Sequence, residues 1–287
     1  MRNSPRGAIP ILLATFCLLA WPELAGAQAD RADRADRADR ADRAEKAEKA
    51  SSLPLAVSPS FALSALSALS ASPASPTEIH WYHAAASLAA VALISLADEP
   101  LRDQLQSHRT SGKDDLARVF KHMGQPEVYG VVGLGTIAVG IIGGNDKVTR
   151  AGERITAGLL TAGIVTSVLK QVVGRERPDS SNDAYSFDPF SGQTSWPSGH
   201  TTMAFALAAS VSDEVHSTPV TIGMYTGAAL TGWSRLNDNK HWLSDVVMGA
   251  LVGITSAKLM NGRWQVFGLR APKFLLEPAA VGVNLRF

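Results

Sequence analysis

Six stretches of the chain that contain no Asp, Glu, Lys or Arg constrain its fold more than any other feature. They cover residues 79–97, 128–144, 155–169, 201–211, 219–233 and 246–257. Apolar and polar residues do not alternate within them, and several stretches are too long for ordinary strands, so we expect helices. We therefore predict an all-α fold, a helical bundle of about six core helices.

The same stretches leave two environments open. The longest of them approach the lower limit of the roughly 20 residues that a helix needs to span a bilayer. They are rich in alanine and glycine, and such small residues let helices approach closely in membranes and in compact bundles alike. The chain could therefore form a membrane-embedded bundle or a compact periplasmic one.

The first 27 residues have the features of a secretory signal peptide. Arg2 and Arg6 supply a basic start, residues 9–20 are apolar, and small residues precede a cleavage site after Ala27. The alternative is an uncleaved membrane anchor. Cys17, the one cysteine of the chain, lies in this segment, so a cleaved chain has no thiol for disulfides or catalysis. We predict an exported protein that is associated with the membrane on its periplasmic side.

Composition divides the rest of the chain into three parts. Residues 28–77 combine repeated acid–base–alanine triplets with a stretch rich in Ser, Ala and Pro, and we expect a disordered or helical spacer. Residues 78–262 contain the apolar stretches and form the expected folded domain. Residues 263–287 alternate apolar side chains near their end, which predicts a short extended tail. The formal net charge of +1 gives no indication of a nucleic-acid partner.

Two short polar stretches offer groups that could bind an anion. In "KQVVGRERP", Lys170 and Arg177 are seven residues apart, so both can lie on one face near a helix end. In "PSGH", Ser198 can cap the helix that follows, Gly199 allows close backbone approach, and His200 falls in the first turn. Each stretch alone also fits an ordinary basic helix terminus or an ordinary helix cap.

A third stretch, "SRLNDNKHWLSD", adds a possible nucleophile. His241 and Asp245 are four residues apart, and a carboxylate on one imidazole nitrogen makes the other nitrogen a better base or nucleophile. Arg235 supplies a planar group of donors suited to phosphate. A Ser198-based acyl hydrolase fits less well, because the chain has no G-x-S-x-G motif and such a site does not need three cations. A metal site also fits less well, because no carboxylate cluster accompanies the histidines.

The three stretches together resemble a known signature. The order K-x6-RP, PSGH and SR-x5-H-x3-D is similar to that of the type 2 phosphatidic acid phosphatase and vanadium haloperoxidase superfamily, and every motif position between Lys170 and Asp245 is filled. The resemblance covers about residues 125–260. It implies a helical-bundle core, in agreement with the apolar stretches.

The resemblance also implies a role for each residue. His241 would attack phosphorus and form a phosphohistidine, and Asp245 would orient it. His200 would protonate the leaving oxygen and then activate water. The phosphoryl oxygens would be held by Lys170, Arg177, Ser198, Gly199 and Arg235. Cations can neutralise the transferred group without a metal, so no metal and no other cofactor are expected.

The substrate is less closely defined. The resemblance implies hydrolysis of a phosphomonoester or diphosphate, in the first place of a lipid such as phosphatidate or a polyprenyl diphosphate. A soluble-substrate acid phosphatase of the same family and a vanadate-dependent haloperoxidase are the alternatives. Residues 236–240, "LNDNK", are more polar than in many lipid phosphatases of the family, which leaves a lipid substrate open. The expected partners are a phosphorylated lipid or small phosphoester and a membrane.

Overall fold

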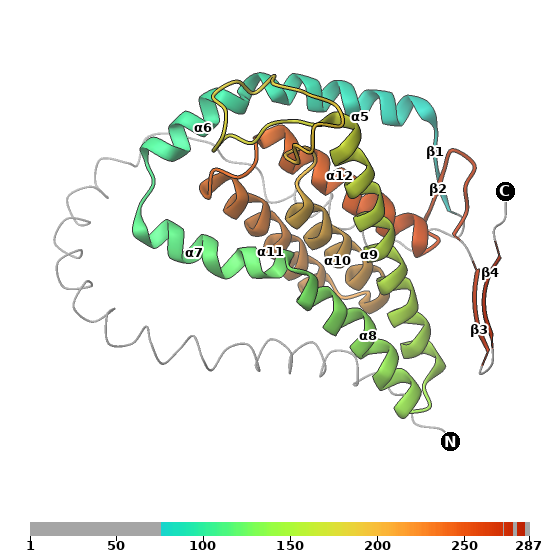
Figure 1. Ribbon diagram of the computed structural model, residues 1–287. Coiled ribbons are helices and arrows are strands. Elements are labelled where there is room, and N and C mark those ends of the chain that lie inside the picture. Colours follow the sequence, from blue (N-terminus) through green and yellow to red (C-terminus); the bar gives the residue numbers. More distant parts are fainter. Residues whose placement is uncertain (1–75, 272, 278–279, 285–287) are drawn as a thin grey trace, which may run out of the picture. The chain divides into compact units, whose positions relative to one another are not determined.

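The computed structural model describes residues 76–271, 273–277 and 280–284 (Figure 1). The predicted signal peptide and nearly all of the predicted spacer lie outside these residues. The elements in chain order are β1 (Thr77–Ile79), α5 (Trp81–Ile94), η1 (Ser95–Ala97), α6 (Asp98–Ser107), α7 (Ser111–Lys121), η2 (His122–Gly124), α8 (Pro126–Ile142), α9 (Asp146–Val173), α10 (Gly199–Val215), α11 (Thr218–Asn237), α12 (Leu243–Met260), β2 (Trp264–Val266), β3 (Lys273–Glu277) and β4 (Ala280–Asn284).

The all-α prediction is confirmed, since each of the six apolar stretches lies mainly in one helix: α5, α8, α9, α10, α11 or α12. Helix α9 is longer than its apolar stretch because its first turns are charged, and Asn145 caps them by accepting from the N–H groups of Lys147 and Val148. The count of about six left out α6 and α7. These two short helices carry many charged residues and so lack the apolar stretches on which the prediction depended.

The core helices are arranged so that one end of the bundle collects the polar motifs. The end of α9, the start of α10, the end of α11 and the start of α12 all reach this end, which we call the site end. At the opposite end, Arg154 of α9 forms an ion pair with Glu214 of α10 at 2.8 Å. There too, Lys258 of α12 pairs with Asp213 of α10 at 2.6 Å. These contacts show that α9 runs antiparallel to α10 and α12, which run in the same direction.

Helix α5 runs beside α12 in the opposite direction. Strand β1, directly before α5, pairs in parallel with β2, which follows the end of α12. At the other end of α5, Asp98 accepts a hydrogen bond from the backbone N–H of Ser244, in the first turn of α12. The start of α5 therefore lies at the end of the molecule opposite to the polar motifs.

Small residues bring α10 and α12 close together at the site end. A Cβ atom added at Gly249 of α12 would lie 2.7 Å from the carbonyl oxygen of Ser198, which is closer than real Cβ contacts. At Gly253 an added Cβ would meet the carbonyl oxygen of Thr202 even more closely. The glycines predicted to serve packing therefore set the distance between the helix that carries "PSGH" and the helix that follows "SRLNDNKHW".

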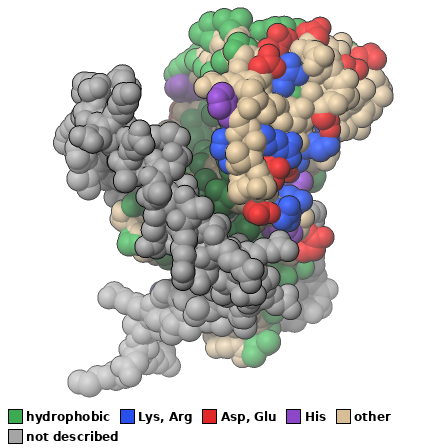
Figure 2. Space-filling view, turned by 90° about the vertical axis from the view of Figure 1, so that its left-hand side faces the viewer, with side chains coloured by type: hydrophobic (Ala, Val, Ile, Leu, Met, Phe, Trp, Pro, Cys, Tyr) green, Lys and Arg blue, Asp and Glu red, His purple; other side chains and the backbone are tan. Residues whose placement is uncertain are grey.

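Three helical segments are long and apolar enough to cross a bilayer, judged by length and composition: Trp81–Ser107, Asp146–Val173 and Leu243–Met260. Large apolar side chains on α8 and α9 point outward, and Ile142, Leu160 and Ile164 have exposed fractions of 86%, 62% and 65%. On the side where α6 and α7 lie, charged side chains of both signs gather along one flank, and an apolar area lies above them (Figure 2). This distribution supports membrane association.

The C-terminal part of the chain is extended, as predicted for the tail. Strands β3 and β4 form an antiparallel pair in which Lys273 lies opposite Asn284 and Glu277 lies opposite Ala280. Strand β2 is not part of that pair, because it joins β1 instead. The segment after residue 262 thus begins with a strand that contacts the helical domain.

Candidate active site

The site is built around the loop that joins α9 to α10. Helix α9 is capped at its C-terminal end by Gly174, which has a left-handed φ of 58° that L side chains rarely adopt. A side chain there would also collide with the carbonyl of Asp188, so only glycine allows the loop to fold back over the helix end. The loop then returns through Ser195 to the start of α10, where the backbone N–H of Ser198 donates to the carbonyl oxygen of Asp245 at 3.0 Å.

The cations of the first motif meet at one residue of this loop. Lys170, in the last turn of α9, donates from Nζ to the carbonyl oxygen of Thr194. Arg177 donates from Nη2 to Thr194 Oγ1 at 3.2 Å. The two cations that the sequence places near a helix end are thus brought to the same place.

The third predicted cation has an unused donor. Arg235 lies in the last turn of α11, is 8% exposed, and forms an ion pair from Nη1 with Asp238 Oδ2 at 2.8 Å. Its buried Nε has no hydrogen-bond partner among the described residues. A buried N–H without an acceptor is costly, and an oxyanion would satisfy it.

The "PSGH" residues lie at the start of α10. Ser198 occupies the N-cap position, but its hydroxyl accepts from Thr201 Oγ1 at 2.9 Å rather than from a backbone N–H. A Cβ atom added at Gly199 would lie 3.8 Å from Cε of Lys170, so this backbone is close to the lysine. His200 follows in the first turn of the helix. The predicted anion-binding groups of the first two motifs are therefore neighbours.

His241 and Asp245 face one another across the start of α12. The distance from His241 Nδ1 to Asp245 Oδ2 is 3.4 Å, and the two side chains are 4% and 0% exposed. The same Oδ2 accepts from the backbone N–H of Trp242 at 2.9 Å and from Ser195 Oγ at 2.6 Å. Because Nδ1 is turned to the carboxylate, Nε2 is the nitrogen left for attack on a substrate.

The electrostatic surroundings keep both histidines neutral near pH 7. Burial lowers the pKa of His241 to about 4 from the ordinary 6.5, although the hydrogen bond and the charge of Asp245 act in the opposite direction. Burial is also the first cause that lowers the pKa of His200 to about 4, and nearby positive charges add to it. These charges belong to Arg235, His241, Lys170 and Arg177. A neutral imidazole at His241 is what a nucleophile requires.

The comparison with family models agrees with this arrangement. Residues 154–266 match the model described as PAP2 superfamily. The chain is therefore similar to this family over a segment that begins inside α9, ends with β2 and includes all three motifs.

The curated proteins that are similar to part of this chain include two named lipid A 1-phosphatases. The one from Porphyromonas gingivalis is 37% identical over 115 residues, which is 39% of this chain and 22% of that protein. The one from Rhizobium etli is 33% identical over 97 residues, 32% of this chain and 41% of that protein. The match thus spans less than half of the length of either relative.

A solved structure shows the same fold. The crystal structure of the first transmembrane PAP2 type phosphatidylglycerolphosphate phosphatase from Bacillus subtilis aligns with a TM-score of 0.50 at 20% identity. The alignment covers 62% of this chain and 94% of that one. The helical fold of the described residues is therefore similar to the fold of that structure.

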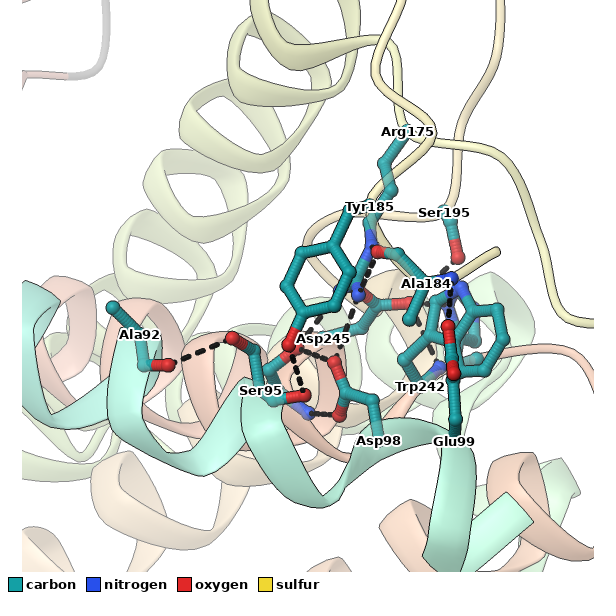
Figure 3. A network of polar contacts seen from close by, with 12 residues as sticks. Ala92, Ser95, Asp98, Glu99, Arg175, Ala184, Tyr185, Ser195, Trp242 and Asp245 are labelled. Carbon is teal, nitrogen blue, oxygen red and sulfur yellow. Dashed lines mark hydrogen bonds and ion pairs between the residues drawn. The ribbon is translucent and has the colours of Figure 1, made fainter. Parts of the chain in front are cut away.

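Sequence reasoning missed two buried residues beside Asp245. Arg175, 1% exposed, donates to Asp245 Oδ1 at 2.7 Å and to Asp98 Oδ2 at 2.8 Å (Figure 3). The sequence contained a partial signal, since "GRERP" has two arginines and only Arg177 belongs to the recognised motif. No sequence pattern indicated Asp98, because it lies 77 residues from Arg175 along the chain, at the start of a helix that was not predicted.

The polar stretch "LNDNK" has a structural explanation. Its Asp238 pairs with Arg235, and its Lys240 pairs with Asp179 of the loop after α9. Asn239 Nδ2 donates to the carbonyl oxygen of Pro178 at 3.2 Å. These contacts join the end of α11 to the loop between α9 and α10, so the polarity of the stretch is no argument against a lipid substrate.

Proposed function

We propose that this protein is a PAP2-type phosphatase that hydrolyses a phosphate ester of a membrane lipid through a phosphohistidine intermediate. One observation carries the proposal: a buried, neutral His241 oriented by Asp245 lies among groups that bind oxyanions. Arg235 offers an unpaired buried Nε to the same place. The relatives named as phosphatases support the reaction class.

In the first step, Nε2 of His241 attacks phosphorus and the bond from phosphorus to the leaving oxygen breaks. His200 donates its proton to that oxygen, so the lipid alcohol leaves neutral. Bound phosphate raises the pKa of His200, because its negative charge favours the imidazolium form. The cations hold the equatorial oxygens, and Asp245 stabilises the positive charge that develops on His241.

In the second step, neutral His200 accepts a proton from water while the water oxygen attacks phosphorus. The bond from phosphorus to Nε2 breaks, which releases inorganic phosphate and restores neutral His241. The same group thus acts first as an acid and then as a base. Neither step requires an electron acceptor or a group that the chain does not supply.

A phosphorylated glycolipid of the lipid A type is the first substrate to test, because both named relatives are lipid A 1-phosphatases. Phosphatidate and a polyprenyl diphosphate are the next candidates. The outward apolar side chains of α8 and α9 support a substrate held in the bilayer. The ion pairs of "LNDNK" remove the objection that its polarity raised.

The test is release of inorganic phosphate by the full chain, purified in detergent, from these three lipids and from a soluble phosphomonoester. His241→Ala should lose turnover by several orders of magnitude and form no acid-labile phosphoenzyme, since a nucleophile cannot be replaced by water without such a loss. His108→Ala is the matched control, because His108 is exposed and bonds only within its own helix end and the next turn. Turnover and a trapped phosphoenzyme in His241→Ala would refute the assignment.

A further inference from the structure

Arg175 uses all of its donors in a buried network that the reaction steps above leave unexplained (Figure 3). Nε and Nη2 donate to the carbonyl oxygen of Ala184 at 2.9 and 2.5 Å. Nη1 donates to Ser244 Oγ at 2.8 Å and to Asp245 Oδ1 at 2.7 Å, and Nη2 also donates to Asp98 Oδ2 at 2.8 Å. A guanidinium has five N–H groups, and each has an acceptor here, so its plane is fixed in one orientation.

Asp98 fixes the other side of the network. It lies at the start of α6 and is 1% exposed. Its Oδ1 accepts from the backbone N–H of Ser244 at 2.8 Å, and its Oδ2 accepts from Ser244 Oγ at 2.5 Å. This N–H lies in the first turn of α12, where backbone donors have no partner inside the helix. Asp98 thus holds both Arg175 and the turn that carries Asp245.

The network determines how the two oxygens of Asp245 are used. Oδ1 is bound by Arg175, whereas Oδ2 faces His241 and the backbone N–H of Trp242. With Oδ1 tied to the arginine, the carboxylate cannot turn away from the imidazole. A displacement of about 1 Å in such a group can cost 100-fold in rate.

The charges of the network also match the intermediate. Asp98 and Asp245 are buried carboxylates that share one arginine, so the three groups together carry one negative charge. A buried charge needs a partner, and an unmatched one is costly. The phosphohistidine formed on His241 supplies a positive imidazole ring beside that negative charge.

We propose that Arg175 and Asp98 are positioning residues of the phosphatase reaction. Arg175 holds Oδ1 of Asp245 so that Oδ2 aligns His241, and Asp98 holds Arg175. The inference rests on the proposed function. Neither residue touches the transferred phosphoryl group in this scheme, so both should affect the rate of attack and leave substrate affinity nearly unchanged.

The experiment compares Asp98→Asn and Arg175→Lys with the wild-type full chain in detergent. We expect kcat and the single-turnover rate of phosphoenzyme formation to fall about 10- to 100-fold, as for other residues that orient a catalytic group, with KM within about twofold. Asp103→Asn is the matched control: Asp103 lies on the same helix and pairs with Arg102 at 2.7 Å, but it is 69% exposed. This control should keep wild-type kinetics.

If Arg175 and Asp98 serve only the stability of the fold, the result is different. In that case the loss of activity equals the loss of folded protein, measured by thermal unfolding and by titration with vanadate, and kcat per folded molecule stays at the wild-type value. That outcome, or a wild-type rate of phosphoenzyme formation in folded Asp98→Asn and Arg175→Lys, overturns the proposal. If neither variant folds, Ser244→Ala carries the test, because it removes a shared hydroxyl and no charge, and it should lower kcat severalfold at unchanged KM.

The wild-type arm separates this proposal from the proposed function. A wild-type protein that releases no phosphate from any of the lipids rejects the phosphatase assignment itself. Wild-type turnover combined with unaffected variants rejects only the positioning role of Arg175 and Asp98.

Discussion

Gly124 is the position where a small change should affect His200, the proposed catalytic acid, most directly. It is buried in η2, against the first turn of α10. A Cβ atom added at Gly124 would lie 2.6 Å from Cβ of His200, 2.8 Å from its Cδ2 and 3.0 Å from its Cα. Carbon atoms in contact prefer about 3.5–4.0 Å, so His200 or η2 must move by about 1 Å in Gly124→Ala. Because the clash involves the backbone of His200 as well as its ring, a rotamer change alone cannot relieve it.

A shift of that size would act on both steps of the proposed reaction, because we propose His200 as the acid in one and the base in the other. We expect Gly124→Ala to lower kcat by about 10- to 100-fold. The assay is phosphate release under saturating substrate, with thermal unfolding measured in the same detergent. Gly130→Ala in α8 is the control, because an added Cβ meets nothing within 4 Å there and alanine favours the helix. A kcat for Gly124→Ala within twofold of that control, in a folded protein, would mean that His200 is not placed by this contact.

Two further predictions concern conditions rather than packing. Activity should survive a metal chelator, because the cations of the site would neutralise the phosphoryl group without a metal. Vanadate, which mimics five-coordinate phosphorus, should inhibit it. A loss of activity in chelator that added metal restores would contradict this prediction. The protein should also lose stability as pH falls from about 6.5 to 4, because the unfolded chain binds a proton at His241 in this range and the folded one does not. The lowered pKa of His241 limits this loss in the free energy of unfolding to about 3 kcal/mol. Thermal unfolding should show a smaller loss of stability between pH 7 and pH 4.5 in His241→Gln than in the wild type. An equal loss in both proteins contradicts the assignment.

The helices could be predicted because uncharged stretches without alternation have few other folded forms. The same rule failed for α6 and α7, where the helix is amphipathic and charged, and where a cap such as Thr110 gives only a local signal. Thr110 accepts from the N–H of Lys113 at 3.4 Å, which is a weak hydrogen bond. Charged helices at the edge of a bundle depend on tertiary contacts for their stability, and these contacts cannot be seen in one sequence.

Some residues of the candidate site could likewise be predicted from the sequence, and others could not. Motif spacing indicated Lys170, Arg177 and His241, and the structure brings them to one end of the bundle, although their catalytic roles remain predictions. Arg175 could not be assigned, because its partners Asp98 and Asp245 lie 77 and 70 residues away along the chain. Local spacing reveals groups that act on the same ligand from one helix end, and it does not reveal the buried groups that hold them.

The path of α5 restricts which side of a membrane the site can face. Glu78 lies in β1, beside the end of α12, whereas Asp98 lies beside the start of α12 with the catalytic residues. If α5 crosses the bilayer, Glu78 and the site lie on opposite sides. A leader that exports the segment before α5 would then place the site on the inner side, so an exported segment and a periplasmic site are compatible only if α5 does not cross. If α5 crosses, the leaflet from which the proposed lipid substrate is taken follows from the side on which Glu78 lies.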